Sequence, residues 1–303
     1  MSKAEKSIEE VDRLGKVSKI SRMLHHPLKY FTAVGYRILI YPIVKKPLYK
    51  KAALFFGETM EVALPAGTDI FISGGKSHDS EIRLAKFFIN TLKTGDAVVD
   101  VGAHFGYFTR LANKLVGPSG VVCAFEPSPD TFQVLNRNCK DFKNILTFPL
   151  IVSEVVGAKS FVSFDSLHSE YASTSIEQYE AQSWYASAKP TITQTKSTSL
   201  DYFLESRQLF PRMIKIDAEG GEWSVLKGAE KHLEITEPIV IMEYLTNKTN
   251  GAYQKCIDFM LTKQYVVYLI DKSGLPVQCT NVEQTLAIKG VESDNVVFLK
   301  VKK

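Results

Sequence analysis

The first segment whose residue types and spacing can do chemistry is a glycine-containing turn after an apolar run. It reads Asp100-Val101-Gly102-Ala103-His104-Phe105-Gly106 and opens a helix that we expect to reach about Leu115. Gly102 and Gly106 let the backbone approach a ligand closely, and the helix N-terminus faces that ligand. A dinucleotide-binding turn has the pattern G-x-G-x-x-G. The spacing D-x-G-x-x-x-G lacks the middle glycine and favours a nucleoside without phosphates, S-adenosylmethionine (AdoMet), although a tight turn without a ligand would also use these glycines.

An acidic residue, Glu126, ends the next apolar run, 24 residues beyond Gly102. A carboxylate at this position can accept hydrogen bonds from both ribose hydroxyls of a bound nucleoside. The position favours an unphosphorylated ribose but does not separate NAD from AdoMet. The structural alternative is that Glu126, placed just before Pro127, only caps the following helix.

A third group of residues is acidic and lies at the ends of two later strands. Asp217 and Glu219 follow one expected strand, and Glu243 closes the next. Carboxyl ends of neighbouring strands share one edge of an open α/β sheet, where ligands bind. Three carboxylates there could supply a general base or hold a divalent metal ion. In the structural alternative, one of these carboxylates caps the helix at Glu222 and another pairs with Lys215.

These residues sit in a regular alternation of apolar runs and amphipathic stretches. Helices fit near 128–142, 222–233 and 252–262. The alternation predicts an α/β fold, with a parallel sheet covered by helices on both faces. Strands are expected at 97–101, 121–125, 145–152, 212–216, 238–242, 265–270 and 295–301.

The remaining chain departs from this alternation. Alternating apolar residues on both sides of a Pro-Ala-Gly-Thr turn predict a hairpin over 59–73, and a helical pattern follows at 81–92. The stretch 165–199 is polar and has little periodicity. Loops of this length in compact domains are usually functional, so we expect a substrate-facing insertion there.

The N-terminal arm is basic, with 12 Lys/Arg against 4 Asp/Glu over residues 1–51, whereas the rest has 25 against 29. Within it, residues 28–56 mix aromatic, aliphatic and basic side chains. This mixture fits either a helix on an anionic membrane surface or a helical cap whose lysines are simply solvated. The most apolar early stretch, Tyr36–Val44, is far shorter than the ~20 residues of a spanning helix.

Cysteine usage and the charged start of the chain bear on location. No CxxC pair or zinc-type spacing occurs among the four cysteines, which indicates buried thiols in a reducing compartment. Residues 1–22 lack the apolar segment of a signal peptide. We therefore expect a cytoplasmic protein, with residues 28–56 as the segment that would contact the inner face of the membrane.

Four segments together resemble a known family, the FkbM family of AdoMet-dependent methyltransferases. They are DAVVDVGAHFGYFT at 96–109, AFEPSP at 124–129, TSLDYFL at 198–204 and IKIDAEGGEWSVLKG at 214–228. The resemblance runs from about residue 60 to the C-terminus. It implies a Rossmann-like, seven-stranded class I methyltransferase sheet. We place this domain at 59–303, after a mostly helical, basic extension at 1–58 that matches no family pattern.

The resemblance also implies roles for individual residues. His104 stands where the family often has Asn, so it would order the turn or contact AdoMet. Glu126 would hold the ribose, and Ser153 would lie near the adenine. The residues implied to line the AdoMet turn are Asp100, Gly102, Ala103 and His104, with Gly106 opening the helix, and those facing the transferred methyl are Asp217, Glu219 and Glu243.

The expected activity is in-line transfer of the AdoMet methyl group to a hydroxyl of a sugar, glycan, glycolipid or secondary metabolite. Asp217 is the first candidate for orienting or deprotonating that hydroxyl, with Glu219 and Glu243 in support. Two alternatives are a non-catalytic AdoMet-binding protein and an NAD-linked oxidoreductase, against which the missing glycine argues. No nucleic-acid partner is expected, because the basic charge is confined to the arm and no amino-methylating Asn/Asp-Pro-Pro motif is present.

Overall fold

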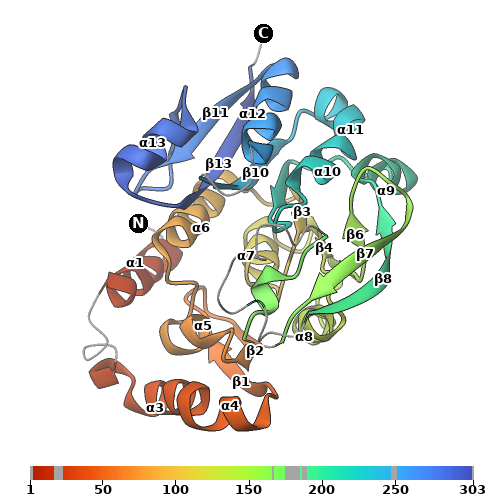
Figure 1. Cartoon of the computed structure of the whole chain (residues 1–303). Coiled ribbons are helices and arrows are strands. Elements are labelled where there is room, and N and C mark those ends of the chain that lie inside the picture. The colour runs from red at the N-terminus through yellow and green to blue at the C-terminus, as the bar shows by residue number, and fades with distance from the viewer. Residues whose placement is uncertain are drawn as a thin grey trace.

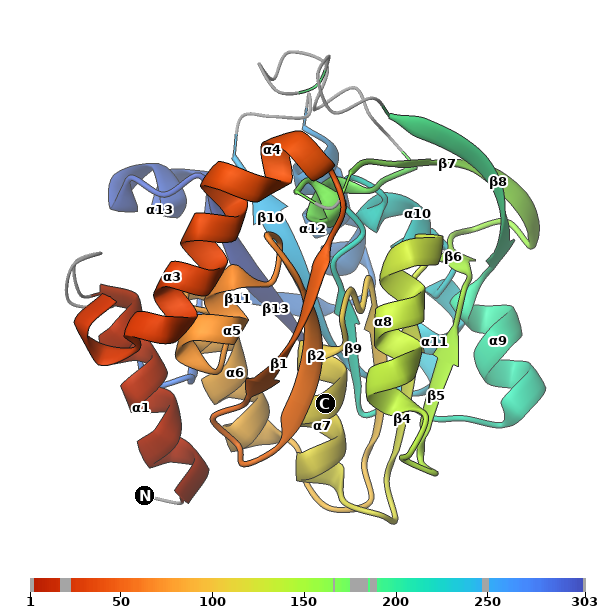
Figure 2. The same ribbon diagram turned by 90° about the horizontal axis from the view of Figure 1, so that it is seen from below.

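A computed structural model of the chain describes residues 3–16, 23–165, 167–174, 185, 190–246 and 251–301. Its centre is an eight-stranded sheet, shown in Figures 1 and 2. In spatial order the strands are β12 (Pro276–Gln278), β11 (Tyr265–Ile270), β13 (Ser293–Lys300), β10 (Ile239–Leu245), β9 (Met213–Ile216), β3 (Ala97–Val101), β4 (Val121–Phe125) and β5 (Ile145–Phe148).

Five neighbouring strands, from β10 to β5, are parallel, and β13 lies antiparallel between β10 and β11. These seven strands are the set that the family resemblance implies. The eighth, β12, pairs antiparallel with the edge strand β11 through a short turn and was not expected. The order reverses at β3, whose neighbours are β4 on one side and β9 on the other. Such a switch point opens a crevice at the carboxyl ends of the strands.

Helices cover both faces of the sheet. Side chains along each strand alternate between the two faces, and each face contributes to its own hydrophobic core. Val98 belongs to one core, and Val99 and Val101 belong to the other. The first face carries α6 (Asp79–Thr91), α7 (Tyr107–Val116) and α8 (Pro129–Cys139). The second carries α9 (Leu200–Arg207), α10 (Glu222–Lys227), α11 (Glu230–Ile235), α12 (Ala252–Thr262) and α13 (Val282–Lys289). The α/β fold expected from the sequence is confirmed.

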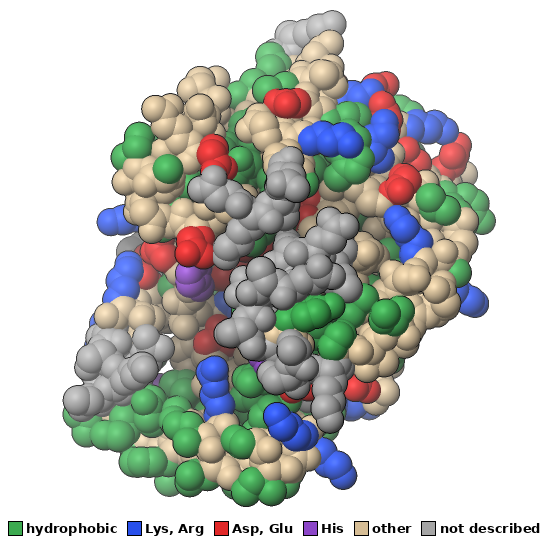
Figure 3. All heavy atoms as spheres, viewed as in Figure 1, with side chains coloured by type: hydrophobic (Ala, Val, Ile, Leu, Met, Phe, Trp, Pro, Cys, Tyr) green, Lys and Arg blue, Asp and Glu red, His purple; other side chains and the backbone are tan. Residues whose placement is uncertain are grey.

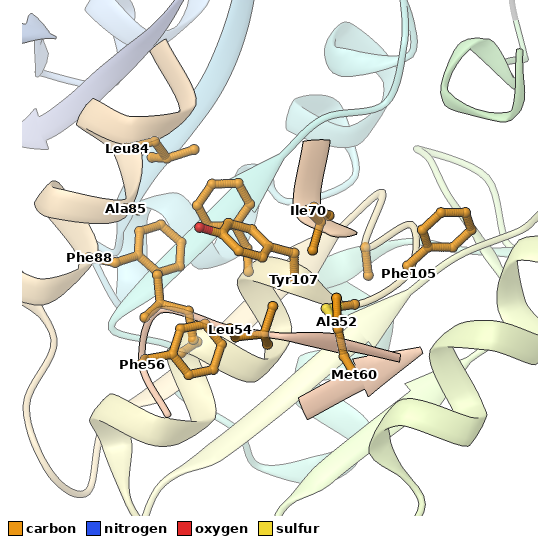
Figure 4. Packing of buried hydrophobic residues seen from close by; sticks show 14 of the residues in the cluster. Ala52, Leu54, Phe56, Met60, Ile70, Leu84, Ala85, Phe88, Phe105 and Tyr107 are labelled. Atoms are coloured by element: carbon orange, nitrogen blue, oxygen red, sulfur yellow. The ribbon is translucent and has the colours of Figure 1, made fainter. Parts of the chain in front are cut away.

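The N-terminal elements pack on the first face rather than standing apart. They are α1 (Lys3–Lys16), α3 (Pro27–Gly35), the π-helix η1 (Tyr36–Ile40), α4 (Tyr41–Val44), β1 (Leu48–Ala53), β2 (Thr59–Leu64) and α5 (Thr68–Ser73). Figure 4 shows Ala52, Leu54 and Phe56 together with Phe105 and Tyr107 of the glycine turn and the start of α7. The early chain therefore supports the segment that was expected to bind the nucleoside.

The prediction of a hairpin over 59–73 is wrong. Strand β2 pairs antiparallel with the preceding β1, and the segment after the turn forms helix α5. The backbone there makes helical hydrogen bonds: the N–H of Phe71 donates to the carbonyl of Gly67 at 3.0 Å and the N–H of Gly74 to the carbonyl of Ile70 at 2.9 Å. In this conformation Ile70, Phe71 and Ile72 are all buried. Among the described residues, no helix has the length and apolar character needed to cross a bilayer.

A small second sheet follows β5. It consists of β6 (Ile151–Val152), β8 (Thr191–Thr198) and β7 (Gly157–Ser163), so the strand expected over 145–152 is split between two sheets. The polar stretch 165–199 is also not one irregular insertion. It contains the short 3-10 turn η2 (Ser169–Tyr171) and ends in β8, while 175–184 and 186–189 lie outside the described residues.

Candidate active site

The glycine turn after β3 is held by the ends of two neighbouring strands. The N–H groups of Gly102 and Ala103 both donate to the carbonyl of Phe125, at 3.0 and 2.9 Å. Gly102 has φ +74, and a Cβ atom added there would lie 1.8 Å from the carbonyl oxygen of Asp217. Only glycine fits this position, because any side chain would separate the strand ends that form the crevice.

Glu126 is buried beside this turn and is held by two backbone groups. The N–H of His104 donates to Oε2 and the N–H of Ser128 donates to Oε1, both at 2.9 Å. Burial raises the pKa of Glu126 to about 7, and the two hydrogen bonds act in the opposite direction. Each carboxylate oxygen keeps a second lone pair, so Glu126 can brace the turn and still accept hydrogen bonds from a ligand.

A cavity of about 400 Å³ lies at the carboxyl ends of the strands and receives side chains from both sides of the switch point. Glu126 follows β4 on one side, whereas Glu243 of β10 and its register partner Asn295 of β13 lie on the other. Six of the residues predicted for the site line this cavity. They are Gly102, His104, Glu126, Asp217, Glu219 and Glu243.

The other four predicted residues lie outside the cavity lining. Asp100 and Ala103 line a much smaller hollow under the turn. Gly106 has φ +92 and caps the N-terminus of α7. The hydroxyl of Ser153 is hydrogen-bonded to the backbone of Val155, and the preceding residues 150–152 line the cavity in its place. The contact between Ser153 and adenine stays a prediction.

Lys215 explains why Asp100 lies beneath the turn. Its ammonium group is 3.4 Å from Oδ1 of Asp100 and 3.2 Å from Oδ2 of Asp217, and it is buried. Thr109 donates to the other oxygen of Asp100 at 2.6 Å. The side chain of Asp100 is thus occupied in joining β3, α7 and β9.

The acidic turn after β9 brings three predicted carboxylates together. Asp217, Glu219 and Glu243 each offer an oxygen, and the three atoms lie within 4.8 Å of one another. Glu222 has a structural role, since its carboxylate accepts from the N–H of Ala218 at 2.9 Å. It fixes the turn that carries Asp217 and Glu219 and does not line the cavity.

The pKa values of two of these carboxylates, Asp217 and Glu243, are shifted in opposite directions. Burial acts to raise the pKa of Asp217, but the ammonium groups of Lys215 and Lys76 hold it below its usual range. Burial raises the pKa of Glu243 to about 8, and the nearby carboxylates of Asp217 and Glu81 add to this shift. A pair of carboxyl groups with separated pKa values at one rim is typical of a site that handles protons.

His104, in contrast to Glu243, does not titrate near neutral pH. Burial, together with the ammonium of Lys76, lowers its pKa to about 3, so the imidazole is neutral at physiological pH. It adopts φ +50 in the turn, and its Nε2 lies 3.2 Å from Oγ of Ser169. This contact ties the glycine turn to η2, which also lines the cavity.

Sequence reasoning missed a charged group contributed by the segment between α5 and α6. Lys76 lies 2.7 Å from Glu81, and both line the cavity with His78. Carboxylates around Lys76 raise its pKa above the ordinary value even though burial opposes this, so the ammonium is charged. The signal was present as the polar run Gly-Gly-Lys-Ser-His at 74–78, immediately before a helix. Glu170 of η2 was missed as well; burial raises its pKa to about 7.

The strand order, with β13 antiparallel between β10 and β11, and the crevice beside the glycine turn define the class I AdoMet-dependent methyltransferase fold. A model of the methyltransferase FkbM domain matches residues 100–270, which is more than half of the chain. The chain belongs to the FkbM methyltransferase domain family.

Comparisons with solved structures give distant similarities. Methyltransferase FkbM from Methylobacillus flagellatus KT is 12% identical, with 77% of this chain and 52% of that one covered and a TM-score of 0.41. Precorrin-6y C5,15-methyltransferase from Geobacter metallireducens GS-15 is 13% identical, with coverages of 73% and 88% and a TM-score of 0.39. Aeropyrum pernix fibrillarin, solved with natively bound S-adenosyl-L-methionine, is 12% identical, with coverages of 71% and 72% and a TM-score of 0.38. No curated protein matches the chain.

Proposed function

We propose that the chain is an AdoMet-dependent O-methyltransferase whose acceptor is a hydroxyl of a sugar, glycan, glycolipid or polyhydroxylated secondary metabolite. The main support for this proposal is that one cavity is lined both by Glu126 and by the rim of Asp217, Glu219 and Glu243. When bound, AdoMet supplies a methyl group already activated by its sulfonium charge. The protein then has to bind, align and remove a proton.

The residues on the β4 side fit the nucleoside. Glu126 offers unused lone pairs to ribose hydroxyls, and the neighbouring walls at Phe125 and 150–152 are largely apolar, as an adenine requires. Gly102 lets the backbone come close to the ligand. The carboxylates of Asp217, Glu219 and Glu243 can complement a sulfonium cation electrostatically.

The residues on the β10 side fit an acceptor with several hydroxyls. This wall is formed by charged or polar side chains, which can donate to and accept from a sugar at several points. An apolar ring would remove water from these groups and leave their remaining hydrogen-bonding capacity unused, at a cost in affinity. The side chains concerned are those of Asp69, Lys76, His78, Glu81, Glu170, Glu243 and Asn295.

In the proposed division of labour, Glu243 accepts the proton of the acceptor hydroxyl. A general base works best when its pKa lies near the working pH, which the pKa of about 8 satisfies. Asp217, kept ionised by Lys215, accepts a hydrogen bond that orients the hydroxyl toward the methyl group. In a variant of this proposal, the three carboxylates hold a divalent metal ion. Loss of activity on addition of a chelator would support this variant.

Two measurements test the function. Calorimetric titrations with AdoMet and with NAD separate a methyltransferase from an NAD-linked oxidoreductase, and we expect binding of AdoMet alone. Incubation with methyl-labelled AdoMet and panels of glycans, glycolipids and hydroxylated metabolites should label one acceptor class on oxygen. Binding of AdoMet with no transfer to any acceptor would instead support the non-catalytic alternative.

A matched pair of variants tests the acceptor wall. Lys76→Met should raise the KM for the acceptor by about tenfold or more while the Kd of AdoMet changes little, because a charged hydrogen bond is lost. Lys159→Met, which removes a lysine outside the cavity, is the control. An equal loss of AdoMet affinity in Lys76→Met would place this lysine in the cofactor site.

A further inference from the structure

The outer surface of the N-terminal helices is unusually apolar. In the described part of the chain, 23 large hydrophobic side chains are exposed, and eight of them lie between residues 24 and 44. The most exposed are Leu28 at 84% and Ile43 at 82%. The set, named here the α3–α4 face, consists of Leu24, Leu28, Phe31, Ile38, Leu39, Ile40, Ile43 and Val44. Figure 3 shows hydrophobic side chains gathered over α3 and α4 at the lower edge of the molecule.

The opposite side of the same helices is anchored in the protein. Ala33, Tyr36 and Tyr41 are buried, and α3 packs against α5. The hydroxyl of Tyr36 donates to the carbonyl of Lys46 at 2.5 Å. Since the inner side is already packed, the helices cannot turn to bury the α3–α4 face without breaking these contacts.

Charge distinguishes this face from a patch of ordinary exposed hydrophobic residues. From residue 13 to residue 57 the sequence has ten Lys/Arg and no Asp or Glu. Arg37, Lys45, Lys46 and Lys51 are exposed, and none forms an ion pair with a carboxylate in the described part of the chain. Apolar side chains flanked by cations that have no carboxylate partner are the chemistry that binds anionic lipid headgroups.

We propose that the α3–α4 face docks on the surface of an anionic phospholipid bilayer. Its apolar side chains enter the boundary between headgroups and acyl chains, and the flanking cations contact lipid phosphates. A second copy of the chain fits less well, because a two-fold contact through this face would place one set of cations against another. This docking does not depend on the methyltransferase activity.

The docked face is connected to the cavity through one short path. The N–H of Leu167 donates to the hydroxyl of Tyr41 at 3.1 Å, and the next residues of that segment, Ser169 to Tyr171, line the cavity. Docking therefore places lipid headgroups beside the segment that borders the acceptor site. A glycolipid acceptor follows from this arrangement, and that last step rests on the proposed function.

The test is flotation of the full-length protein with vesicles. Phosphatidylcholine vesicles and vesicles of phosphatidylcholine with phosphatidylglycerol are compared at low and high NaCl. We expect at least about tenfold tighter binding to the anionic vesicles, weakened by salt, because the cations and the lipid charge are screened.

Two variants separate the apolar and the charged contributions. The triple variant Ile38→Ser, Leu39→Ser, Ile43→Ser should lose about tenfold or more in vesicle affinity, and so should Arg37→Gln, Lys45→Gln, Lys46→Gln. The matched control replaces equally exposed residues elsewhere, Phe210→Ser, Ile235→Ser, Ile288→Ser, and should bind as the wild type does. All the replaced side chains are exposed, so the thermal unfolding midpoint should not change.

Several results would overturn the docking proposal. Equal binding to neutral and anionic vesicles, or wild-type binding by the α3–α4 triple variant, would show that this face does not hold lipid. Light scattering that finds a dimer which the triple variant abolishes would assign the face to a second copy. Failure to bind AdoMet in the calorimetric experiment concerns the proposed function alone, because vesicle binding is measured without AdoMet.

Discussion

The ammonium group of Lys215 lies 3.2 Å from Oδ2 of Asp217, and the two side chains sit at the end of the same strand. This pairing fixes the charge of Asp217 and leaves Glu243, on the neighbouring strand, as the carboxyl with the raised pKa. The same rim therefore offers one acceptor whose pKa is held low and one group able to change its protonation near neutral pH. The predictions below start from this difference.

Asp217→Asn should lower kcat by about 100-fold or more while AdoMet binding persists, since the amide can no longer orient the hydroxyl as a charged acceptor. Lys215 keeps Asp100 as a partner, so the fold should survive. The measurements are steady-state kinetics with the identified acceptor and calorimetry with AdoMet. Turnover at the wild-type rate would move this role to another residue.

Glu243→Gln should remove the pH dependence of the reaction. In the wild type the pKa of about 8 means that Glu243 is mostly protonated at pH 7, so kcat/KM should rise as the pH increases through about 8. The glutamine variant should be slow at all pH values and show no such rise. A wild-type profile that falls across this range would contradict the assignment of the base.

Glu126→Gln should weaken AdoMet binding by about 10- to 100-fold, the loss typical of a hydrogen bond to a charged group. The amide nitrogen of the glutamine would also face one of the N–H donors of His104 and Ser128. The control is Glu205→Gln, which changes an exposed carboxylate away from the cavity. Calorimetry on both variants gives the comparison, and equal affinities would exclude Glu126 from the ribose site.

Gly102→Ala should destabilise the protein by about 3 kcal/mol or more, because the new Cβ would collide with the backbone of Asp217 in a left-handed conformation. Gly35→Ala is the matched control: Gly35 is helical, nothing lies within 4 Å of its Cβ position, and alanine there should stabilise by about 0.5–1 kcal/mol. Urea unfolding of both variants measures the difference. A Gly102→Ala protein as stable as the wild type would show that the strand ends can separate freely.

Glu222→Gln should change the pH dependence of stability. Burial raises the pKa of Glu222 to about 7 from an ordinary value of 4.5, so the folded state holds its proton more tightly than the unfolded state. Stability should then fall as the pH rises from about 4.5 to about 7, by on the order of 3 kcal/mol for this residue. The glutamine keeps an acceptor for the N–H of Ala218 and should flatten that part of the curve. An unchanged slope in denaturation measured at several pH values would argue against this origin.

The strands that carry the site could be predicted closely from the sequence. The runs at 97–101, 121–125 and 265–270 coincide with β3, β4 and β11, because buried parallel or central strands are short apolar runs bounded by turn residues. Helix α12 at 252–262 was also correct. Local chemistry determines these elements, so a single sequence suffices to find them.

The acceptor wall could not be predicted in the same way. Lys76 and Glu81 come from a segment that precedes the methyltransferase motifs, and only tertiary packing of α5 and α6 brings them to the carboxyl ends of the strands. The helix α5 was missed for a related reason, since six residues are too few to show a helical period. The hydroxyl of Ser153 donates to the carbonyl of Val155, and its contact with adenine stays a prediction.

The hydrogen bond between Leu167 and Tyr41 links the rim of the cavity to the helix that faces away from it. Two binding events on either side of such a link obey thermodynamic reciprocity. If occupancy of α4 by lipid strengthens acceptor binding by some factor, acceptor binding must strengthen attachment to lipid by the same factor. With such coupling, the residence time of the protein would be longer on membranes that contain its acceptor. It would dissociate faster from membranes whose acceptor is already methylated.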